Sequence, residues 1–192
     1  MSDQLTDVGD VEQLISEISA LRGKVSQLQE RVEQLDMLAH EDSLVHLPNR
    51  RGFVRALERL IDRVNRYEEK AALLFVDLDG LKVINDSFGH QAGDAALIQV
   101  ARLLVGGVRK SDIVARIGGD EFAILLGHSD EDSARETASR LGDLIAGSDF
   151  SHSNQALPLS VAIGAAPVHA DDTPETAMAR ADREMYRRKA AA

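Results

Sequence analysis

Two pairs of carboxylates stand at the ends of predicted strands. Asp77 and Asp79 close an apolar strand and, because side chains alternate, lie on one side of it. Asp120 and Glu121 directly follow Gly118–Gly119, a turn that lets a ligand approach the backbone closely. Carboxylates are hard ligands suited to Mg²⁺ or Mn²⁺, and a cation relieves the repulsion of adjacent acids. Together the pairs predict a metal site for phosphoryl transfer, although singly they also fit a solvated turn and an ordinary hairpin.

Polar residues beyond the first acidic pair add binding groups. Lys82 lies where its ammonium can meet a phosphate. In the polar and glycine-rich segment 85–94, Asn and Asp side chains offer donors and acceptors that can bind the edge of a purine base. Asp94 also suits the start of a helix, where a carboxylate is favoured by the helix dipole. We interpret His90 as a local hydrogen-bonding residue rather than a ligand.

The spacing of apolar residues predicts the elements that position these groups. Helices are expected near 53–64, 92–105, 130–146 and 173–189, strands at 71–78, 113–117, 122–126 and 157–166, and a polar loop at 148–156. The resulting order α, β, α, β, β, α, β, α predicts an α+β domain over residues 42–192. Its expected core is a ferredoxin-like split βαβ arrangement, a mainly antiparallel sheet flanked by helices.

Residues 1–41 carry a different pattern. Apolar residues alternate in steps of 3 and 4, with Val or Ile at every a position and Leu at every d position: Val11, Leu14, Ile18, Leu21, Val25, Leu28, Val32 and Leu35. This pattern favours a parallel two-stranded coiled coil. Glu17 would face Arg22 of the partner and Arg31 would face Asp36, although each pair contributes little. The alternative is a single amphipathic helix folded back on the domain.

Composition excludes several classes of protein. The 192 residues include no cysteine, which rules out a disulfide scaffold, a thiolate zinc site and a cysteine nucleophile. The formal net charge of −10 argues against a general binder of nucleic acid polymers. The sequence shows no membrane-spanning run and no secretory signal. We expect a cytoplasmic protein without a membrane partner.

The string Gly118–Phe122 resembles the signature of the GGDEF family, the diguanylate cyclases. Further motifs resemble the family pattern in the same order: 47–51, Asp77-Leu78-Asp79 with Lys82, 84–86, Gly89-His90, Gly93-Asp94 and 181–189. The resemblance covers residues 42–189. Val45 and His46 depart from it, because the family usually has Thr and Gly there, and this places the geometry of the connector in question.

The resemblance implies a nucleotidyl-cyclase-like fold and the condensation of two GTP molecules into cyclic di-GMP with release of pyrophosphate. Two domains would face each other, each holding one GTP, so that a homodimer joined by the coil would be the active form. The implied metal ligands for Mg²⁺ or Mn²⁺ are Asp77, the Leu78 carbonyl, Asp120 and Glu121, with Glu121 acting as ligand or as base. The implied catalytic residues are Asp120, Glu121 and Lys82, and the implied GTP-binding residues are Asn85, Asp94, Lys82, Gly118, Gly119 and Lys189.

Arg109 and Asp112 form an Arg-x-x-Asp that resembles the family's inhibitory product-binding site. Arg offers a planar fork for phosphate, and Asp accepts from guanine N–H groups. Arg140 is a candidate second contact. The resemblance therefore implies feedback inhibition by cyclic di-GMP, while the alternative is a surface ion pair.

Two further function classes remain open: a catalytically weak module that binds GTP or cyclic di-GMP and signals through its coil, and a coiled-coil scaffold. The family often continues past the last lysine with a segment that carries a further phosphate-binding arginine. We expect slower turnover here unless Arg187 or Arg188 replaces it. We also expect regulatory input to arrive through the coil, because residues 1–41 leave no room for a sensory domain.

Overall fold

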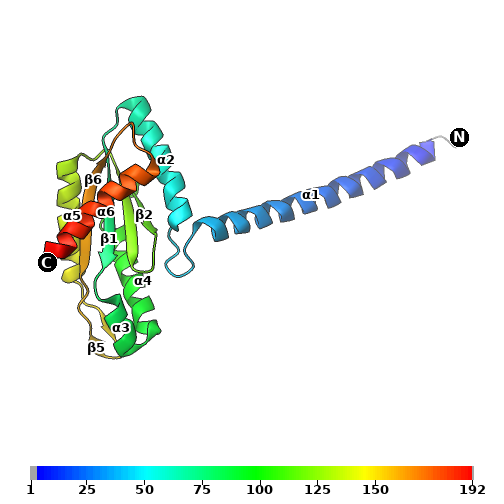
Figure 1. The fold of residues 1–192 in the computed structure, drawn as a ribbon. Coiled ribbons are helices and arrows are strands. Elements are labelled where there is room, and N and C mark those ends of the chain that lie inside the picture. The colour runs from blue at the N-terminus through cyan, green and yellow to red at the C-terminus, as the bar shows by residue number, and fades with distance from the viewer. Residues whose placement is uncertain (1–3, 192) are drawn as a thin grey trace. The chain divides into compact units, whose positions relative to one another are not determined.

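The computed structural model describes residues 4–191, excluding the side chains of residues 4–10, 33, 34, 37, 38 and 191. The chain divides into two compact units, Met1–Ala39 and His40–Ala192. Helix α1 (Gln4–His40) makes up the first unit, and the second holds five helices and six strands among the described residues (Figure 1). No helix in the described part of the chain is long and apolar enough to span a membrane.

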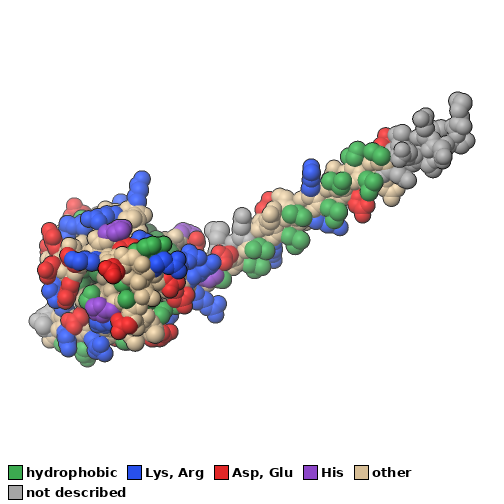
Figure 2. Space-filling view, turned by 90° about the horizontal axis from the view of Figure 1, so that it is seen from above, with side chains coloured by type: hydrophobic (Ala, Val, Ile, Leu, Met, Phe, Trp, Pro, Cys, Tyr) green, Lys and Arg blue, Asp and Glu red, His purple; other side chains and the backbone are tan. Residues whose placement is uncertain are grey.

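Helix α1 carries an exposed apolar stripe. The eight seam residues from Val11 to Leu35 are each 48–65% exposed, and Ile15, at an e position beside the seam, is 58% exposed. Figure 2 shows hydrophobic side chains at the surface along the described part of this helix. A surface of this kind is costly in water unless another helix covers it. Pairing with a second copy stays a prediction.

The second unit is built on a four-stranded sheet in which all neighbours are antiparallel. Its order is β2 (Ile113–Arg116), β3 (Glu121–Gly127), β1 (Ala71–Leu78) and β6 (Val161–Val168). This order agrees with the predicted split βαβ arrangement. A small separate hairpin joins β4 (Ser151–His152) to β5 (Gln155–Ala156).

Helices cover both faces of this sheet (Figure 1). Helices α2 (Arg50–Tyr67) and α6 (Pro174–Ala191) pack on the face that includes Leu73 and Phe75, while α4 (His90–Gly106) and α5 (Glu131–Ala146) pack on the face that includes Leu74 and Val76. Because β1 is buried on both faces, its sequence reads as a continuous apolar run up to Asp77. Burial of both faces fixes the strand ends at which the acidic residues lie.

Three local predictions were wrong. The sequence predicted no helix between the strand 71–78 and residue 92, but helix α3 (Leu81–Phe88) lies there; it buries only Ile84 and so lacks an apolar period. Glycines at positive φ, Gly80 and Gly89, bound this helix. The predicted polar loop holds β4 and β5. The last strand begins at Val161 rather than at residue 157, because Pro158 has no N–H for a ladder.

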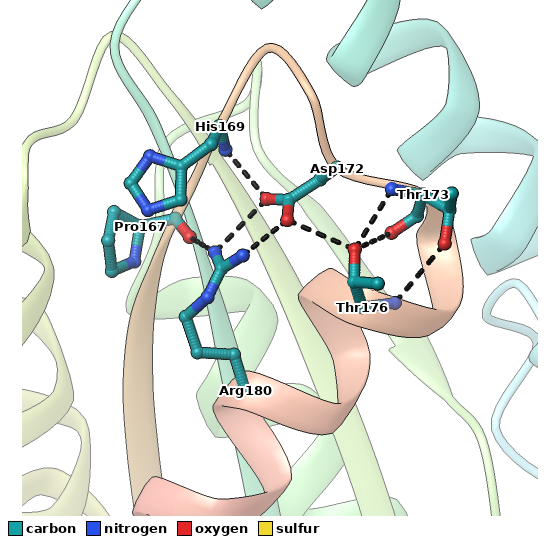
Figure 3. A network of polar contacts seen from close by, with 6 residues as sticks. All are labelled: Pro167, His169, Asp172, Thr173, Thr176 and Arg180. Carbon is teal, nitrogen blue, oxygen red and sulfur yellow. Dashed lines mark hydrogen bonds and ion pairs between the residues drawn. The ribbon is translucent and has the colours of Figure 1, made fainter.

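A polar network fixes the loop between β6 and α6 (Figure 3). The Asp172 carboxylate accepts from the His169 N–H at 2.7 Å and from the Thr176 hydroxyl at 3.0 Å. The Arg180 guanidinium binds the same carboxylate and donates to the Pro167 carbonyl. Burial alone would raise the pKa of Asp172, but these hydrogen bonds outweigh it and hold that pKa below its ordinary value. The start of α6 is thereby tied to the end of β6.

Candidate functional site

The two acidic pairs meet at one end of the sheet. Asp77, on β1, lies directly opposite Glu121 on β3 in the antiparallel register. Beyond the ladder, the Leu78 N–H donates to the Asp120 carbonyl at 3.0 Å. Asp77 is only 8% exposed, which is unusual for a carboxylate and calls for a compensating positive charge.

The Gly118–Gly119 turn is shaped to leave room for the acid beside it. The N–H groups of Ile117 and Gly118 donate to the Glu121 carbonyl at 2.9 and 3.3 Å. A Cβ at Gly118 would overlap the Oε2 of Glu121, whereas one at Gly119 would meet nothing. The first glycine therefore accommodates a side chain of this protein, and the second leaves the backbone open to a ligand.

Arg116 links this turn to the connector that precedes α2. Its guanidinium donates to the Gly119 carbonyl at 2.7 Å and to the two carboxylate oxygens of Asp42 at 3.1 and 3.2 Å. Asp42 also accepts from the N–H groups of Leu44 and Val45 at 3.0 and 3.1 Å. Asp42 and Arg116 were not among the residues predicted from the sequence. The available signal was an arginine two residues before the glycines, but its partner lies 74 positions away.

Unbalanced negative charge surrounds Glu121. Burial, followed by the charges of Asp120, Asp77 and Asp182, raises the pKa of Glu121, and only Arg50 opposes this. A carboxyl group with a raised pKa is a better proton acceptor near neutral pH than an ordinary glutamate.

Lys189 supplies the positive charge at Asp77. Its Nζ lies 2.5 Å from the Asp77 Oδ1, although the two residues are 112 positions apart. This hydrogen bond, with the charges of Asp77, Asp79 and Asp120, raises the pKa of Lys189 against the opposing effect of burial. The last helix therefore brings its predicted phosphate-binding lysine into the acidic cluster.

The predicted metal ligands fit a hard divalent cation by their chemistry. Within the described residues, no three His, Asp or Glu side chains converge on one metal position. The set nevertheless consists of oxygen donors, and the charges of Asp77 and Asp120 raise the pKa of Glu121. The ammonium of Lys189 already pairs with the Asp77 carboxylate. Neighbouring carboxylates that favour a cation suit Mg²⁺ or Mn²⁺.

The predicted guanine-binding residues lie on the two helices that follow β1. Asn85, on α3, lies directly against α4, because a Cβ at Gly93 would overlap its Oδ1. Asp94 is exposed in the first part of α4. Lys82 is exposed on α3 and forms no hydrogen bond or ion pair with the carboxylates among the described residues. The structure thus brings Asn85 next to the residue before Asp94 and leaves Lys82 on the surface.

The three predicted inhibitory residues line one small cavity of about 120 Å³: Arg109, Asp112 and Arg140. Asp112 accepts from the Arg109 N–H at 2.9 Å through its Oδ2. Its Oδ1 is buried and has no hydrogen-bond partner among the described residues. An acceptor of this kind is costly unless a donor reaches it.

Arg187 and Arg188, the two candidates for a further phosphate-binding arginine, have different surroundings. Arg187 forms an ion pair with Glu184 at 2.5 Å and lines a hollow with Arg180. Arg188 lines that hollow and a second one that includes Asp79 and Lys189. Of these two arginines, Arg188 is the one that also borders the acidic cluster.

Comparison with known proteins identifies the family. The family model described as "Diguanylate cyclase, GGDEF domain" matches residues 39–192. The chain belongs to the GGDEF family. Diguanylate cyclase TpbB of Pseudomonas aeruginosa is 38% identical over 186 residues, which make up 93% of this chain and 42% of TpbB. This chain spans less than half the length of that relative.

Solved structures agree with the GGDEF fold. The GGDEF domain of TpbB from Pseudomonas aeruginosa is 39% identical, with a TM-score of 0.75 over 80% of this chain and 90% of that one. A structure of the coiled coil and GGDEF domain of DgcB from Caulobacter crescentus, in complex with c-di-GMP, gives a TM-score of 0.86. It covers 93% of this chain and 95% of that one, and at 24% identity it establishes the fold alone. The predicted family and the antiparallel sheet flanked by helices are confirmed.

Proposed function

We propose that this protein is a cytoplasmic diguanylate cyclase that condenses two GTP molecules into cyclic di-GMP. One observation carries the proposal: the Gly118–Gly119 turn places Glu121 opposite Asp77, and Lys189 reaches the same carboxylate from the last helix. Acidic metal ligands beside a backbone open to phosphates suit nucleotidyl transfer better than passive binding.

The reaction consists of two equivalent transfers. In each, the 3′-hydroxyl of one GTP attacks the α-phosphate of the other, a new O–P bond forms, and the bond to the β-phosphate breaks as pyrophosphate leaves. The hydroxyl proton passes to Glu121, whose raised pKa suits it to accept that proton. Most of the rate enhancement comes from alignment and charge stabilisation.

Mg²⁺ or Mn²⁺ would be held by Asp77, the Leu78 carbonyl and Asp120, with Glu121 as a further ligand in the alternative in which it is not the base. When bound, the cation screens these carboxylates from the triphosphate and polarises the α-phosphate. Lys189 would then leave the Asp77 carboxylate and bind the terminal phosphates, and Lys82 would bind the same phosphates.

Asn85 and Asp94 would bind the guanine edge by hydrogen bonds. An amide offers both a donor and an acceptor, and a carboxylate accepts from the guanine N–H groups. The contact of Asn85 with Gly93 supports this role, because it limits the rotation of the amide beside the start of α4.

The functional unit would be a homodimer joined through the α1 stripe as a parallel coiled coil. Each domain holds half of the reactants, so joining two domains raises their effective concentration for one another. The regular a and d positions and their exposure support this pairing.

Cyclic di-GMP would inhibit the enzyme by binding at Arg109, Asp112 and Arg140. The buried Oδ1 of Asp112, which has no partner among the described residues, supports the assignment, because guanine N–H groups can satisfy it. The DgcB structure noted above was solved with c-di-GMP bound, which makes this product a reasonable ligand to test first.

The test is chromatographic measurement of product formed from GTP and Mg²⁺. We expect cyclic di-GMP from the unaltered protein, none from Glu121→Gln, and an unchanged rate from Glu136→Gln, which alters an exposed acid on α5. Absence of product after removal of bound nucleotide would refute the cyclase and favour the weak binding module. Added cyclic di-GMP should inhibit the unaltered enzyme, and equal inhibition of Arg109→Ala would refute the inhibitory site.

A further inference from the structure

A second hollow adjoins the small inhibitory cavity. Its volume is about 540 Å³, and Val108, Arg109 and Asp112 line both this hollow and the cavity of about 120 Å³. Two hydrogen bonds fix the turn between the two spaces. The Asp112 N–H donates to the Arg109 carbonyl at 3.0 Å, and the Arg109 N–H donates to the Asp112 Oδ2 at 2.9 Å. This turn therefore forms a shared wall, and the exposed Arg109 borders both sides.

The inhibitory cavity is too small to hold a whole cyclic dinucleotide. Sites that bury most of a small molecule have volumes of roughly 300–1,000 Å³. The cavity lies below that range, so it has room for only part of such a ligand. The adjoining hollow lies within the range. A cyclic dinucleotide bound at Arg109 extends beyond the cavity, and the hollow provides space on the other side of the same residue.

The walls of the hollow are mostly apolar. Six of its nine lining residues are apolar, and they come from the connector before α2, the end of α4, the turn after it and β2. Val105, near the end of α4, is 48% exposed although its side chain is apolar. Apolar walls of this kind bind the face of a planar base by removing it from water, and they do not select among its hydrogen-bonding groups.

Positive charge predominates over the two spaces. Arg109, Lys110 and Arg140 line them, and Asp112 is the one carboxylate among their lining residues. Within the described part of the chain, none of the three cations forms an ion pair. Three cations against one carboxylate leave an excess of two positive charges. This excess matches the two phosphodiesters of a cyclic dinucleotide.

We propose that this hollow binds one base of cyclic di-GMP while the other base lies on Asp112 in the inhibitory cavity. The phosphates would lie between the bases, on Arg109 and Lys110, and the base in the hollow would pack on Val105 and Pro48. One base would be recognised by hydrogen bonds and the other held by apolar contact alone. The inference rests on the proposed inhibitory function and adds to it a second base site that includes the connector.

Binding in the hollow would also restrain the connector. Leu47 and Pro48 line the hollow. The Leu47 carbonyl accepts from the Asp42 N–H at 2.8 Å, and the Pro48 carbonyl accepts from the Arg116 N–H at 2.9 Å. A base packed on these residues shields both hydrogen bonds from water and opposes their opening. We therefore expect slower hydrogen exchange at Asp42 and Arg116, which a ligand confined to the small cavity would not produce.

Titration calorimetry with the full chain and cyclic di-GMP, after removal of bound nucleotide, tests the second base site. Val105→Asp places a carboxylate in the hollow and should weaken binding by about tenfold or more, in a protein that still unfolds cooperatively. Ile98→Asp alters an exposed apolar residue of the same helix that lines neither space, and it should leave the affinity unchanged. Lys110→Gln should weaken binding by about threefold and reduce its dependence on salt.

Two related ligands separate the two base sites. Cyclic GMP–AMP keeps one guanine for Asp112, so its affinity should lie within about threefold of that of cyclic di-GMP. Cyclic di-AMP offers no guanine and should bind about tenfold or more weakly. An equally large loss of affinity for both ligands would contradict a second site that holds its base by apolar contact.

Hydrogen exchange followed by NMR locates the ligand. Cyclic di-GMP should slow exchange at Asp42 and Arg116, and Val105→Asp should abolish this effect. Binding that Arg109→Ala weakens but Val105→Asp does not, or protection confined to residues 109–112, would overturn the second base site and leave the inhibitory site standing. No binding to the unaltered protein would refute both, whatever its rate of product formation. If Val105→Asp changes self-association in sedimentation but not the affinity, the occupant is a second copy and the proposal is wrong.

Discussion

Removing the Asp42 carboxylate is expected to destabilise the globular unit, because this residue fixes the connector before α2. Its Oδ1 accepts from two backbone N–H groups, and both oxygens accept from Arg116. The Asp42 and Arg116 side chains are 23% and 13% exposed, so the pair is partly shielded from water. Hydrogen bonds to charged groups are worth about 1.5–3 kcal/mol, and breaking a fully buried pair costs about 3–5 kcal/mol.

Two substitutions separate these contributions. Asp42→Asn keeps an oxygen for the backbone N–H groups but loses the charge, and we expect a loss of about 1–2 kcal/mol. Asp42→Ala loses both and leaves Arg116 with only the Gly119 carbonyl, for an expected loss of about 3 kcal/mol. For a unit of this size, about 1 kcal/mol lowers Tm by about 2–4 °C. The order of the two losses is the decisive feature.

Thermal unfolding followed by circular dichroism measures both effects. Asp62→Asn, at an exposed position on α2, is the matched control and should leave Tm unchanged. Burial would raise the pKa of Asp42, but hydrogen bonds from Val45, Leu44 and Arg116 outweigh it and lower that pKa. A lowered pKa stabilises the folded state above the ordinary aspartate value, and the contribution is lost as the pH falls through the folded value.

Asp42→Asn should therefore show its full deficit at neutral pH, and the deficit should shrink as the pH falls below about 4. If Asp42→Asn and Asp42→Ala unfold at the same temperature as the unaltered protein, the contacts of Asp42 contribute no stability. A deficit that stays constant into acid would refute the role assigned to the charge.

Three other substitutions have expected outcomes. Gly164→Ala should lower the free energy of unfolding, measured in urea, by about 2–3 kcal/mol, because a Cβ there overlaps the Met185 nitrogen and the Ala181 carbonyl of α6. An unchanged urea midpoint would contradict that packing. His46 has φ 54°, so His46→Gly should raise the free energy of unfolding by about 0.5–1 kcal/mol, and a loss in the same titration would contradict the left-handed conformation. Because the pKa of Glu121 is raised, its ionised form destabilises the folded state; Glu121→Gln should raise Tm at pH 7, and the gain should vanish as the pH falls toward the ordinary glutamate value. Calorimetry across that range measures this gain, and a lower Tm at pH 7 would show that Glu121 stabilises the fold.

Local patterns determined the elements. The apolar run from Ala71 to Val76 in β1 predicts a buried strand, because no polar residue interrupts it before Asp77. The Gly-Gly turn between two apolar runs predicts the β2–β3 hairpin. The same patterns place both acidic pairs at strand ends. The antiparallel order of the sheet follows from the sequence of elements, because short connections and right-handed crossovers leave few arrangements.

The connector before α2 contains a left-handed residue, His46. His46 occupies a position where the family usually has glycine, and its positive φ gives the physical reason for that preference. The sequence marked this departure without indicating whether the geometry had changed. The structure shows the left-handed backbone conformation at position 46, which is strained for histidine because it carries a Cβ.

Only the tertiary structure decided which distant groups meet. The contacts of Arg116 with Asp42 and of Lys189 with Asp77 join residues 74 and 112 positions apart, and no periodicity encodes such pairs. Helix α3 was missed because it buries one residue and depends on the fit of Asn85 against Gly93. The different surroundings of Arg187 and Arg188 likewise follow from the packing of helices on a sheet. Sequence spacing fixes the face of an element, whereas long-range packing fixes what that face meets.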